Sequence, residues 1–158
     1  MSQIENEKKL TTPTSRKYLV FKLNDFLYAV PLSDVKEIIG LPQVVPVPQN
    51  PEYLLGLINL RGRVISAIDL KKRLEIKKSA EVKRPAVILV EDGSKVIGCV
   101  VDSIQEVLSI REEEIERSIK ENVPVASMYI QGAARFNDKP MILMLDLRKI
   151  TDLGVQTH

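Results

Sequence analysis

The sequence contains very little of the residues on which many catalytic and metal sites depend. Among its 158 residues there is one cysteine, Cys99, one histidine, the final His158, and no tryptophan. A single cysteine excludes a disulfide within the chain. One cysteine and one terminal histidine do not supply the ligands of a typical zinc site, and no internal histidine can act as the base of a nucleophilic triad. We therefore expect neither a metal site nor triad catalysis.

Glycine-rich phosphate-binding loops are also missing. The sequence has neither GxGxxG nor GxxxxGK[ST], the patterns that hold dinucleotides and nucleoside triphosphates. No local group of carboxylates stands out from ordinary surface charge, although an enzyme that uses Asp and Glu as acid and base remains an alternative. The sequence thus predicts no cofactor and no enzymatic activity.

Long hydrophobic runs are absent as well. Apolar runs such as residues 86–90 and 141–145 have the length of strands, whereas a membrane span needs about 18 apolar residues or more. Residues 1–17 lack the apolar stretch of a signal peptide. We expect a cytoplasmic protein with no direct membrane insertion. Cys99 lies in the apolar run 96–101, and we interpret it as a buried packing residue.

Aromatic residues are few, at 4% of the chain. Surfaces that bind nucleic acids combine basic residues with aromatic side chains on which bases stack. Residues 71–84 are rich in Lys and Arg but contain no aromatic residue. We therefore predict no nucleic-acid partner and interpret residues 71–84 as a basic connecting region. A β-barrel that binds small molecules or nucleic acids remains a remote alternative.

What the sequence does contain indicates one globular domain. Hydrophobic residues make up 44% of the chain and charged residues 28%, with a net charge of +2, unlike the composition of disordered chains. We predict a flexible N-terminal tail over residues 1–16, a single domain over 17–152 and a C-terminal tail over 153–158.

Short β-rich segments separated by turn residues predict a mainly β domain. Apolar residues alternate on both sides of the Asn24-Asp25 turn signal, which is typical of a hairpin. Two further β-rich runs flank Gly62, and Asp69 is placed to cap a short helix over 70–74. The segment 110–122 is rich in helix formers and predicts a short acidic helix or turn.

The second half of the chain repeats the plan of the first. Val35 and Glu37 correspond to Ile104 and Glu106, and residues 56–69 correspond to 132–146, ending in the phrases IDLKK and LDLRK. We infer a duplication that produces two similar β-subdomains, each a small barrel because closure hides sheet edges. Two barrels side by side leave a groove along their seam, a common position for ligands.

The most distinctive motif is residues 56–70, GLINLRGRVISAIDL. Its NLRG core, followed by DL, resembles the signature of the CheW family, the coupling proteins of bacterial chemotaxis. Similar phrases occur in YLVFKL, VKEI, VIGCVVD and EVLS, so the resemblance covers roughly residues 17–150. Ser66 and Ala67 stand where the family usually has Pro-Val, which concerns local packing more than partner choice.

This resemblance implies a fold, a function and partners. The fold would be two interlocked, SH3-like five-stranded β-barrels with a few short helices. The function would be that of a non-catalytic scaffold that couples the cytoplasmic tips of methyl-accepting chemoreceptors to the regulatory domain of the histidine kinase CheA. A CheW-like adaptor of a non-flagellar chemosensory pathway remains an alternative. Association with membrane receptor arrays would occur through protein contacts alone.

The resemblance also implies binding residues. Those matching family positions at the receptor- or kinase-facing surface are Val35, Glu37, Arg61, Gly62, Val87, Gly98 and Val107. From the residues themselves, an Arg beside a turn glycine presents its planar fork to a carboxylate. We hypothesise that Glu37 and Arg61 form an ion pair that shapes the binding surface. Core packing remains an alternative role for Val35 and Val107, as does a plain turn or bulge for Gly62 and Gly98.

Overall fold

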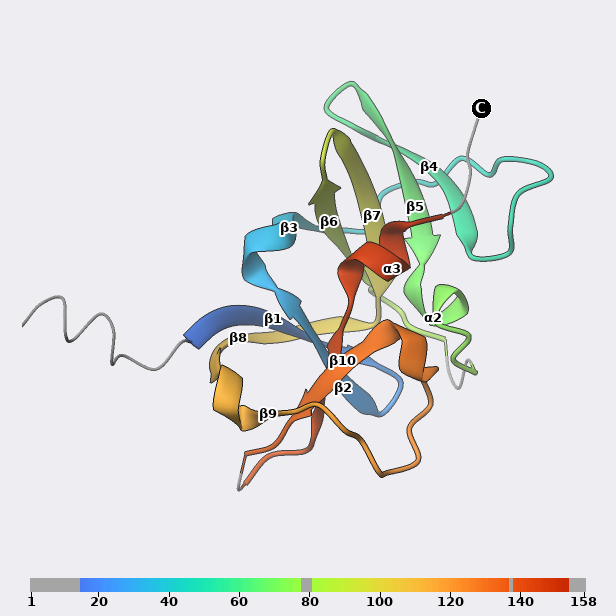
Figure 1. Cartoon of the computed structure of the whole chain (residues 1–158). Helices are drawn as coiled ribbons and strands as arrows, with labels where there is room; N and C mark the ends of the chain where they lie inside the picture. Colours follow the sequence, from blue (N-terminus) through green and yellow to red (C-terminus); the bar gives the residue numbers. More distant parts are fainter. Residues whose placement is uncertain (1–14, 78–80, 137, 154–158) are drawn as a thin grey trace, which may run out of the picture.

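The computed structural model of the chain describes residues 15–77, 81–136 and 138–153. Its strands form two sheets that lie one above the other (Figure 1). The lower sheet has the order β8-β1-β2-β11-β10-β9. Its strands are β1 (Ser15–Leu23), β2 (Phe26–Pro31), β8 (Ser103–Arg111), β9 (Ile115–Glu116), β10 (Ile130–Ala134) and β11 (Ile142–Leu145).

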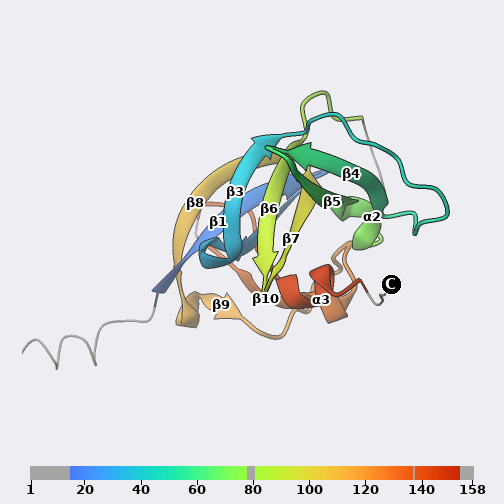
Figure 2. The same cartoon turned by 90° about the horizontal axis from the view of Figure 1, so that it is seen from above.

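The upper sheet has five strands in the order β3-β6-β7-β5-β4. They are β3 (Val35–Gly40), β4 (Leu54–Leu60), β5 (Arg63–Asp69), β6 (Ala86–Asp92) and β7 (Lys95–Val101). Seen from above, this sheet curls so that the ends of its two outer strands, β3 and β4, come together (Figure 2). The mainly β fold of two barrels is therefore confirmed, with one addition: the lower sheet gains a sixth strand, the two-residue β9.

The two halves of the repeat exchange their hairpins. The β1–β2 hairpin of the first half pairs with β8 and, in parallel, with β11 of the second half. Reciprocally, the β6–β7 hairpin of the second half pairs with β3 and, in parallel, with β5 of the first half. Each barrel is thus built from both halves of the chain, which interlocks the two subdomains.

Three clusters of buried side chains hold the sheets together. One cluster lies within the lower barrel, around Val20 and Met144, and another within the upper barrel, around Val87 and Leu89. The largest cluster, which we call the shared core, contains residues of both sheets. Successive strand residues point to opposite faces, so each sheet has one face in its own barrel and the other in the shared core. This explains why the central strands are continuous apolar runs.

Both repeats end in a short helix with the same cap. These helices are α2 (Leu70–Arg73) and α3 (Leu147–Thr151). Asp69 Oδ1 accepts hydrogen bonds from the first backbone N–H groups of α2, and Asp146 Oδ1 does the same for α3. An aspartate satisfies donors that a helix start otherwise leaves unpaired. The predicted cap at Asp69 is confirmed, and its recurrence at Asp146 supports the duplication.

Short 3₁₀ turns complete the connections. They are η1 (Leu32–Asp34), η2 (Glu112–Glu114) and η3 (Ser127–Tyr129). The predicted acidic turn in 110–122 is confirmed by η2. None of the helices in the described ranges is long and apolar enough to cross a membrane.

A buried ion pair ties α2 to the exchanged hairpin. Lys71 Nζ lies 2.8 Å from Asp102 Oδ1, and the two side chains are only 8% and 15% exposed. The other carboxylate oxygen of Asp102 accepts a hydrogen bond from the backbone N–H of Asn24, in the β1–β2 turn, at 2.8 Å. One carboxylate thereby links the first hairpin, the β7–β8 junction and α2.

Arg73 makes a second tie, between α2 and the end of α3. Its guanidinium donates to the backbone carbonyls of Lys149, Ile150 and Asp152 at 2.8–2.9 Å. The same group lies over the rings of Tyr53 and Tyr129, 5.1 and 5.4 Å from their centres. Because C-terminal carbonyls of a helix lack intrahelical donors, Arg73 both caps α3 and joins the two barrels.

Some predicted boundaries shift in the structure. Ser15 and Arg16, which we assigned to the N-terminal tail, are the first residues of β1. Residues 1–14 of that tail and 154–158 of the C-terminal tail lie outside the described residues. The first three residues of the basic region 71–84 belong to helix α2 and not to a connection. Residues 78–80 of this region also lie outside the described residues.

Candidate functional site

The hypothesised ion pair between Glu37 and Arg61 is present at the surface of the upper barrel. Two parallel hydrogen bonds join the guanidinium to the carboxylate, Nη2 to Oε1 at 2.5 Å and Nη1 to Oε2 at 3.3 Å. The Arg61 side chain is 68% exposed and the Glu37 side chain 34%. This fork-to-fork geometry fixes the orientation of both groups while leaving them exposed.

The Arg61-Gly62 turn explains how the guanidinium is positioned. These two residues form the whole loop between β4 and β5, and both have positive φ, 50° and 87°. Such a pair of left-handed residues is typical of the two-residue turn that matches the twist of a hairpin. The side chain of Asn59 accepts a hydrogen bond from the Gly62 N–H at 3.0 Å and braces the turn. Gly62 is thus needed for the turn that presents Arg61.

The ion pair bridges the two edges of the curled sheet. Glu37 lies on edge strand β3 and Arg61 at the end of β4, the opposite edge. Glu37 is paired with Leu89, which belongs to the inner cluster of the upper barrel, and paired residues point to the same face. The Glu37 carboxylate therefore lies on the face of β3 that is turned toward the inside of the upper barrel. There it meets Arg61, which comes from the opposite edge of the same sheet.

The pair also changes the titration of both groups. The hydrogen bond from Arg61 lowers the pKa of the Glu37 carboxyl below its ordinary value of 4.5, and the hydrogen bond to Glu37 raises the pKa of Arg61. The carboxylate therefore stays charged over the whole neutral and mildly acidic range. This surface therefore carries a fixed pair of opposite charges.

Val87 and Gly98 lie beneath this surface rather than on it. Both are buried, and the side chain of Val87 is 0% exposed. A Cβ added to Gly98 would come within 2.9 Å of Val87 Cγ1. Gly98 therefore makes room for Val87 in the upper barrel, and neither residue is exposed on the surface that carries Glu37 and Arg61.

Val35 and Val107 lie along the seam between the barrels. Val35 is half-buried and packs against the shared core, whereas Val107 on β8 is 48% exposed. Val107 is paired with Leu19 of the shared core, so its side chain lies on the shared-core face at the edge of the lower sheet. Val35 is therefore mainly a packing residue, whereas Val107 is about half exposed at the edge of the sheet.

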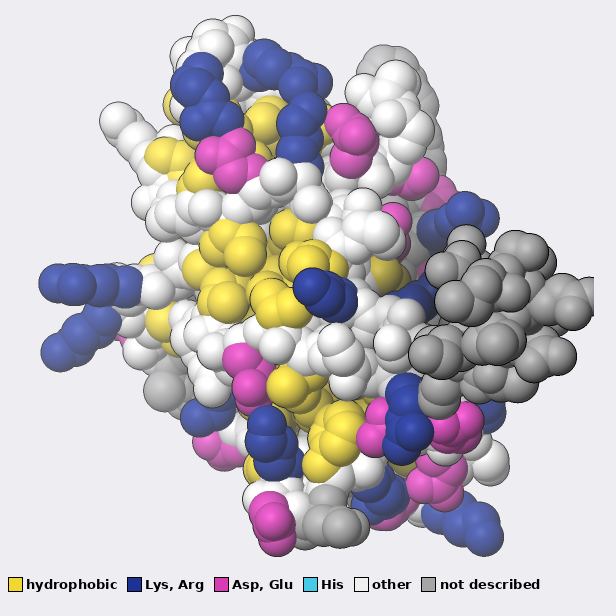
Figure 3. Space-filling model, turned by 90° about the vertical axis from the view of Figure 1, so that its left-hand side faces the viewer, with side chains coloured by type: hydrophobic (Ala, Val, Ile, Leu, Met, Phe, Trp, Pro, Cys, Tyr) yellow, Lys and Arg dark blue, Asp and Glu magenta, His cyan; other side chains and the backbone are white. Residues whose placement is uncertain are grey.

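Ile38 and Ile104 extend this seam, and sequence reasoning missed both as site residues. Ile38 is 42% exposed and is paired with Ile88 of the shared core, while Ile104 packs against that core from β8. We call Val35, Ile38, Ile104 and Val107 the apolar seam. The face of the molecule that carries β3 and β8 shows hydrophobic side chains gathered at its centre (Figure 3). The repeat was the available signal, because Ile38 and Val107 occupy corresponding positions of the two halves.

A second ion pair occupies the corresponding place on the lower barrel. Glu106 corresponds to Glu37, and its Oε2 lies 3.4 Å from Lys139 Nζ in the β10–β11 connection. Glu106 is paired with Val20, an inner residue of the lower barrel. Sequence reasoning matched the two glutamates but did not include Lys139, because the two connections differ in length and residue type.

Gly56 is a further essential position, although it lies in the motif and not among the predicted site residues. Its φ is +149°, and an added Cβ would lie 2.2 Å from the carbonyl oxygen of Val45. At this point residues 44–46 cross β4 and form a bridge between Val45 and Leu57. Only glycine permits this close backbone approach, so the motif glycine shapes the hairpin that carries Arg61.

No metal-binding arrangement accompanies this surface. Within the part of the chain that the structure describes, no group of three His, Cys, Asp or Glu side chains could hold a metal ion. Cys99 is buried in the shared core as predicted, and burial raises the pKa of its thiol to about 12.

Known proteins with similar sequences and structures identify the family. A probable chemotaxis protein CheW of Rhizobium etli is 30% identical over 135 residues, which are 85% of this chain and 86% of that protein. The chemotaxis protein CheW of Klebsiella aerogenes is 28% identical over 151 residues, or 95% of this chain and 90% of that protein.

A solved structure has the same fold. The crystal structure of the scaffolding protein TtCheW from Thermoanaerobacter tengcongensis matches with a TM-score of 0.79 and 33% identity, over 89% of this chain and 95% of that one. The CheW-like domain family matches residues 17–154. The resemblance first noted in residues 56–70 is thereby confirmed, and the chain belongs to the CheW-like domain family.

Proposed function

We propose that this chain is a non-catalytic adaptor of bacterial chemotaxis that couples methyl-accepting chemoreceptors to the histidine kinase CheA. In this role it works at the cytoplasmic tips of the receptors and reaches the receptor array through protein contacts alone. Membership of a family whose relatives are named chemotaxis and scaffolding proteins supports the adaptor role.

The observation that carries the proposal is the double role of strand β3. Glu37 lies on one face of this strand and forms the charged surface with Arg61. The next residue, Ile38, lies on the other face and belongs to the apolar seam. Two chemically different surfaces on one rigid strand suit a protein that binds two partners at the same time.

Each surface suits one of the two partners. Receptor tips are helical hairpins, and a helix docks into an apolar groove through spaced anchors, so we assign the apolar seam, with Val35 and Val107, to the receptor. We assign Glu37, Arg61 and the Gly62 turn to the kinase regulatory domain. Val87 and Gly98 support the charged surface from beneath.

Coupling by such an adaptor requires no chemical step. The two ties through Lys71 and Arg73 hold the barrels in one relative orientation. A bound receptor and a bound kinase domain therefore keep a defined geometry. A change in the receptor alters kinase activity when it changes the contacts that the two states make through the adaptor.

The proposal is tested by NMR titration of the ¹⁵N-labelled protein, first with a CheA regulatory domain and then with a receptor-tip fragment from the same organism. We expect the kinase domain to shift signals around Glu37 and Arg61, and the receptor fragment to shift signals along the seam. Silence with both correctly folded partners would rule the proposal out.

Variants separate the two surfaces. Arg61→Asn removes the fork but keeps a residue that tolerates positive φ, so the fold should remain while kinase binding weakens at least about tenfold. Val107→Asp places a charge in the seam and should weaken only receptor binding. Lys139→Ala, which removes the corresponding ion pair of the lower barrel, is the matched control for Arg61→Asn and should leave kinase binding unchanged.

A further inference from the structure

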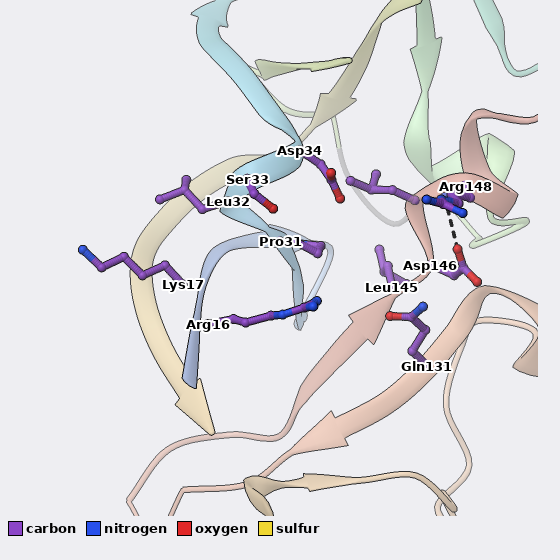
Figure 4. Close-up of a pocket in the computed structure, with 11 residues that line it drawn as sticks. Arg16, Lys17, Pro31, Leu32, Ser33, Asp34, Gln131, Leu145, Asp146 and Arg148 are labelled. Carbon is purple, nitrogen blue, oxygen red and sulfur yellow. Dashed lines mark hydrogen bonds between the residues drawn. The ribbon is translucent and has the colours of Figure 1, made fainter. Parts of the chain in front are cut away.

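A cavity of about 790 Å³ lies at the junction of the two barrels beside α3 (Figure 4). The start of β1, the turn η1, strands β10 and β11 and the first turn of α3 contribute its walls. Arg16 points into it from one side, toward Gln131, and Arg148 stands on the opposite side, whereas Lys17 points away (Figure 4). None of the predicted site residues lines this cavity.

The two arginines of this pocket have no carboxylate partner among the residues that the structure describes. Neither Arg16 nor Arg148 forms an ion pair or a side-chain hydrogen bond with any residue that the structure describes. Four other surface arginines, Arg61, Arg111, Arg117 and Arg135, pair with glutamates, whereas Arg63 and Arg84, which do not line this cavity, form no ion pair among the described residues. Two arginines that line one cavity, with no ion-pair partner among the described residues, are suited to receive a carboxylate from outside.

The corresponding junction in the other half of the molecule is already filled. Lys71 lies two residues after Asp69, the cap of α2, just as Arg148 lies two residues after Asp146, the cap of α3. Lys71 forms the buried ion pair with Asp102. On the α3 side, Asp34 lies at the junction of η1 and β3 and lines the cavity. It forms no ion pair with Arg148 or any other described residue. The junction beside α2 is therefore closed by the ion pair between Lys71 and Asp102, whereas the junction beside α3 contains an open pocket.

The remaining walls are suited to the hydrocarbon part of an acidic side chain. Pro31, Leu32 and the buried Leu145 line the cavity. Leu32 also packs against the shared core, as Val35 of the apolar seam does. Turn η1 of the pocket wall leads directly into Val35, the first residue of the seam to which we assign the receptor helix.

We propose that this pocket receives a glutamate or aspartate side chain of the chemoreceptor tip, held between Arg16 and Arg148, while the receptor helix lies along the apolar seam. This inference rests on the proposed function and adds the chemistry by which the partner is recognised. Gln131 contributes an amide beside the guanidinium of Arg16. Asp146 is engaged as the cap of α3, so Asp34 is the one uncommitted carboxylate of the pocket lining among the described residues.

The test measures binding of a receptor-tip fragment to Arg16→Glu and Arg148→Glu by calorimetry at two salt concentrations. Both side chains are exposed, so both variants should fold. We expect each variant to bind at least about tenfold more weakly than the unaltered protein, with a smaller dependence on salt. Arg84→Glu is the matched control, because Arg84 is exposed, unpaired among the described residues and lies just before β6; it should bind normally.

A second variant distinguishes an acidic occupant from a basic one. Asp34→Asn removes a carboxylate from the pocket lining, so it should tighten binding of the receptor fragment if a carboxylate enters. Weaker binding by Asp34→Asn would overturn the proposal, because it would mean that a cation of the partner contacts Asp34.

Two further outcomes are distinguishable. If the unaltered protein does not bind the fragment, the proposed function fails; if it binds and both arginine variants bind equally well, only the pocket assignment fails. Sodium glutarate is the small-molecule arm. Saturation of the Arg16 and Arg148 side-chain signals by glutarate at concentrations below those needed for the fragment would assign the pocket to a small dicarboxylate and overturn the docking proposal.

Discussion

The two halves of this protein have the same architecture and different surface chemistry. Glu37 and Glu106 occupy corresponding positions on β3 and β8, and each reaches across the mouth of its barrel to a cation. On the upper barrel the partner is Arg61, with two hydrogen bonds, whereas on the lower barrel it is Lys139, with one contact of 3.4 Å. Only the upper pair has a defined orientation, because Lys provides a point charge and Arg a planar fork.

The junctions at the two helices differ in the same way. Lys71 and Asp102 close the α2 side with a buried ion pair, while Arg148 and Asp34 line an open pocket on the α3 side. The two junctions thus differ in charge pairing: the chain's own ion pair closes the α2 side, whereas the α3 side has a pocket whose arginine and Asp34 form no ion pair among the described residues.

The largest effect should come from breaking the closed junction. Lys71→Met leaves the Asp102 carboxylate buried without its cation, which typically destabilises a protein by about 3–5 kcal/mol. Arg148→Met, at the corresponding position of the open junction, should change the free energy of unfolding by less than about 0.5 kcal/mol. Urea unfolding followed by circular dichroism measures both. The double variant Lys71→Met/Asp102→Asn removes the uncompensated charge but keeps an oxygen that accepts from the Asn24 N–H, so it should recover most of the loss. Similar losses for Lys71→Met and Arg148→Met would contradict the comparison.

The next largest effect concerns Arg73, whose position in the other repeat is taken by the buried Ile150. Arg73→Lys keeps the charge but loses the fork that reaches three carbonyls. We expect a loss of about 1–3 kcal/mol and faster amide hydrogen exchange in α3. Lys72→Ala, the exposed neighbour, is the control and should change neither quantity. Unchanged exchange in α3 for Arg73→Lys would show that the tie between the helices is dispensable.

A smaller effect, of opposite sign, is expected at Tyr28. Its counterpart in the second half is the apolar Ile97, and its buried hydroxyl has no hydrogen-bond partner in the described structure. Burial raises the pKa of this phenol, and an unsatisfied buried hydroxyl costs about 1–3 kcal/mol. Tyr28→Phe keeps the stacking with Phe21 and should raise stability by about 1 kcal/mol. Destabilisation on removal of the hydroxyl would mean that it is bonded in solution.

The smallest effect on stability is expected for the Glu37–Arg61 pair. Because the pKa of Glu37 is lowered in the folded state, its contribution is present above the ordinary carboxyl range and is lost as the pH falls through the folded pKa. NMR titration of the Glu37 carboxyl should give a midpoint below 4.5, and Arg61→Asn should raise it. An unchanged midpoint in Arg61→Asn would mean that the two groups are not paired in solution.

The sequence by itself determined the local features of this protein. The Asn24-Asp25 and Arg61-Gly62 turns, the cap at Asp69 and the strand alternation depend on backbone preferences of a few neighbouring residues. The duplication was also readable, because matched phrases recur in order. The family resemblance pointed to Glu37 and Arg61, and a fork beside a turn glycine is a pattern whose geometry follows from residue type.

Only the tertiary structure decided which of these features meet. Exchange of the hairpins depends on pairings between strands far apart in the chain, and no local preference encodes such pairings. For the same reason the sequence did not separate Val87, buried within a barrel, from Val107, exposed at the seam. It likewise did not predict that Lys71 closes one junction while Arg148 leaves the other open, since burial of a charge depends on what the rest of the fold places around it.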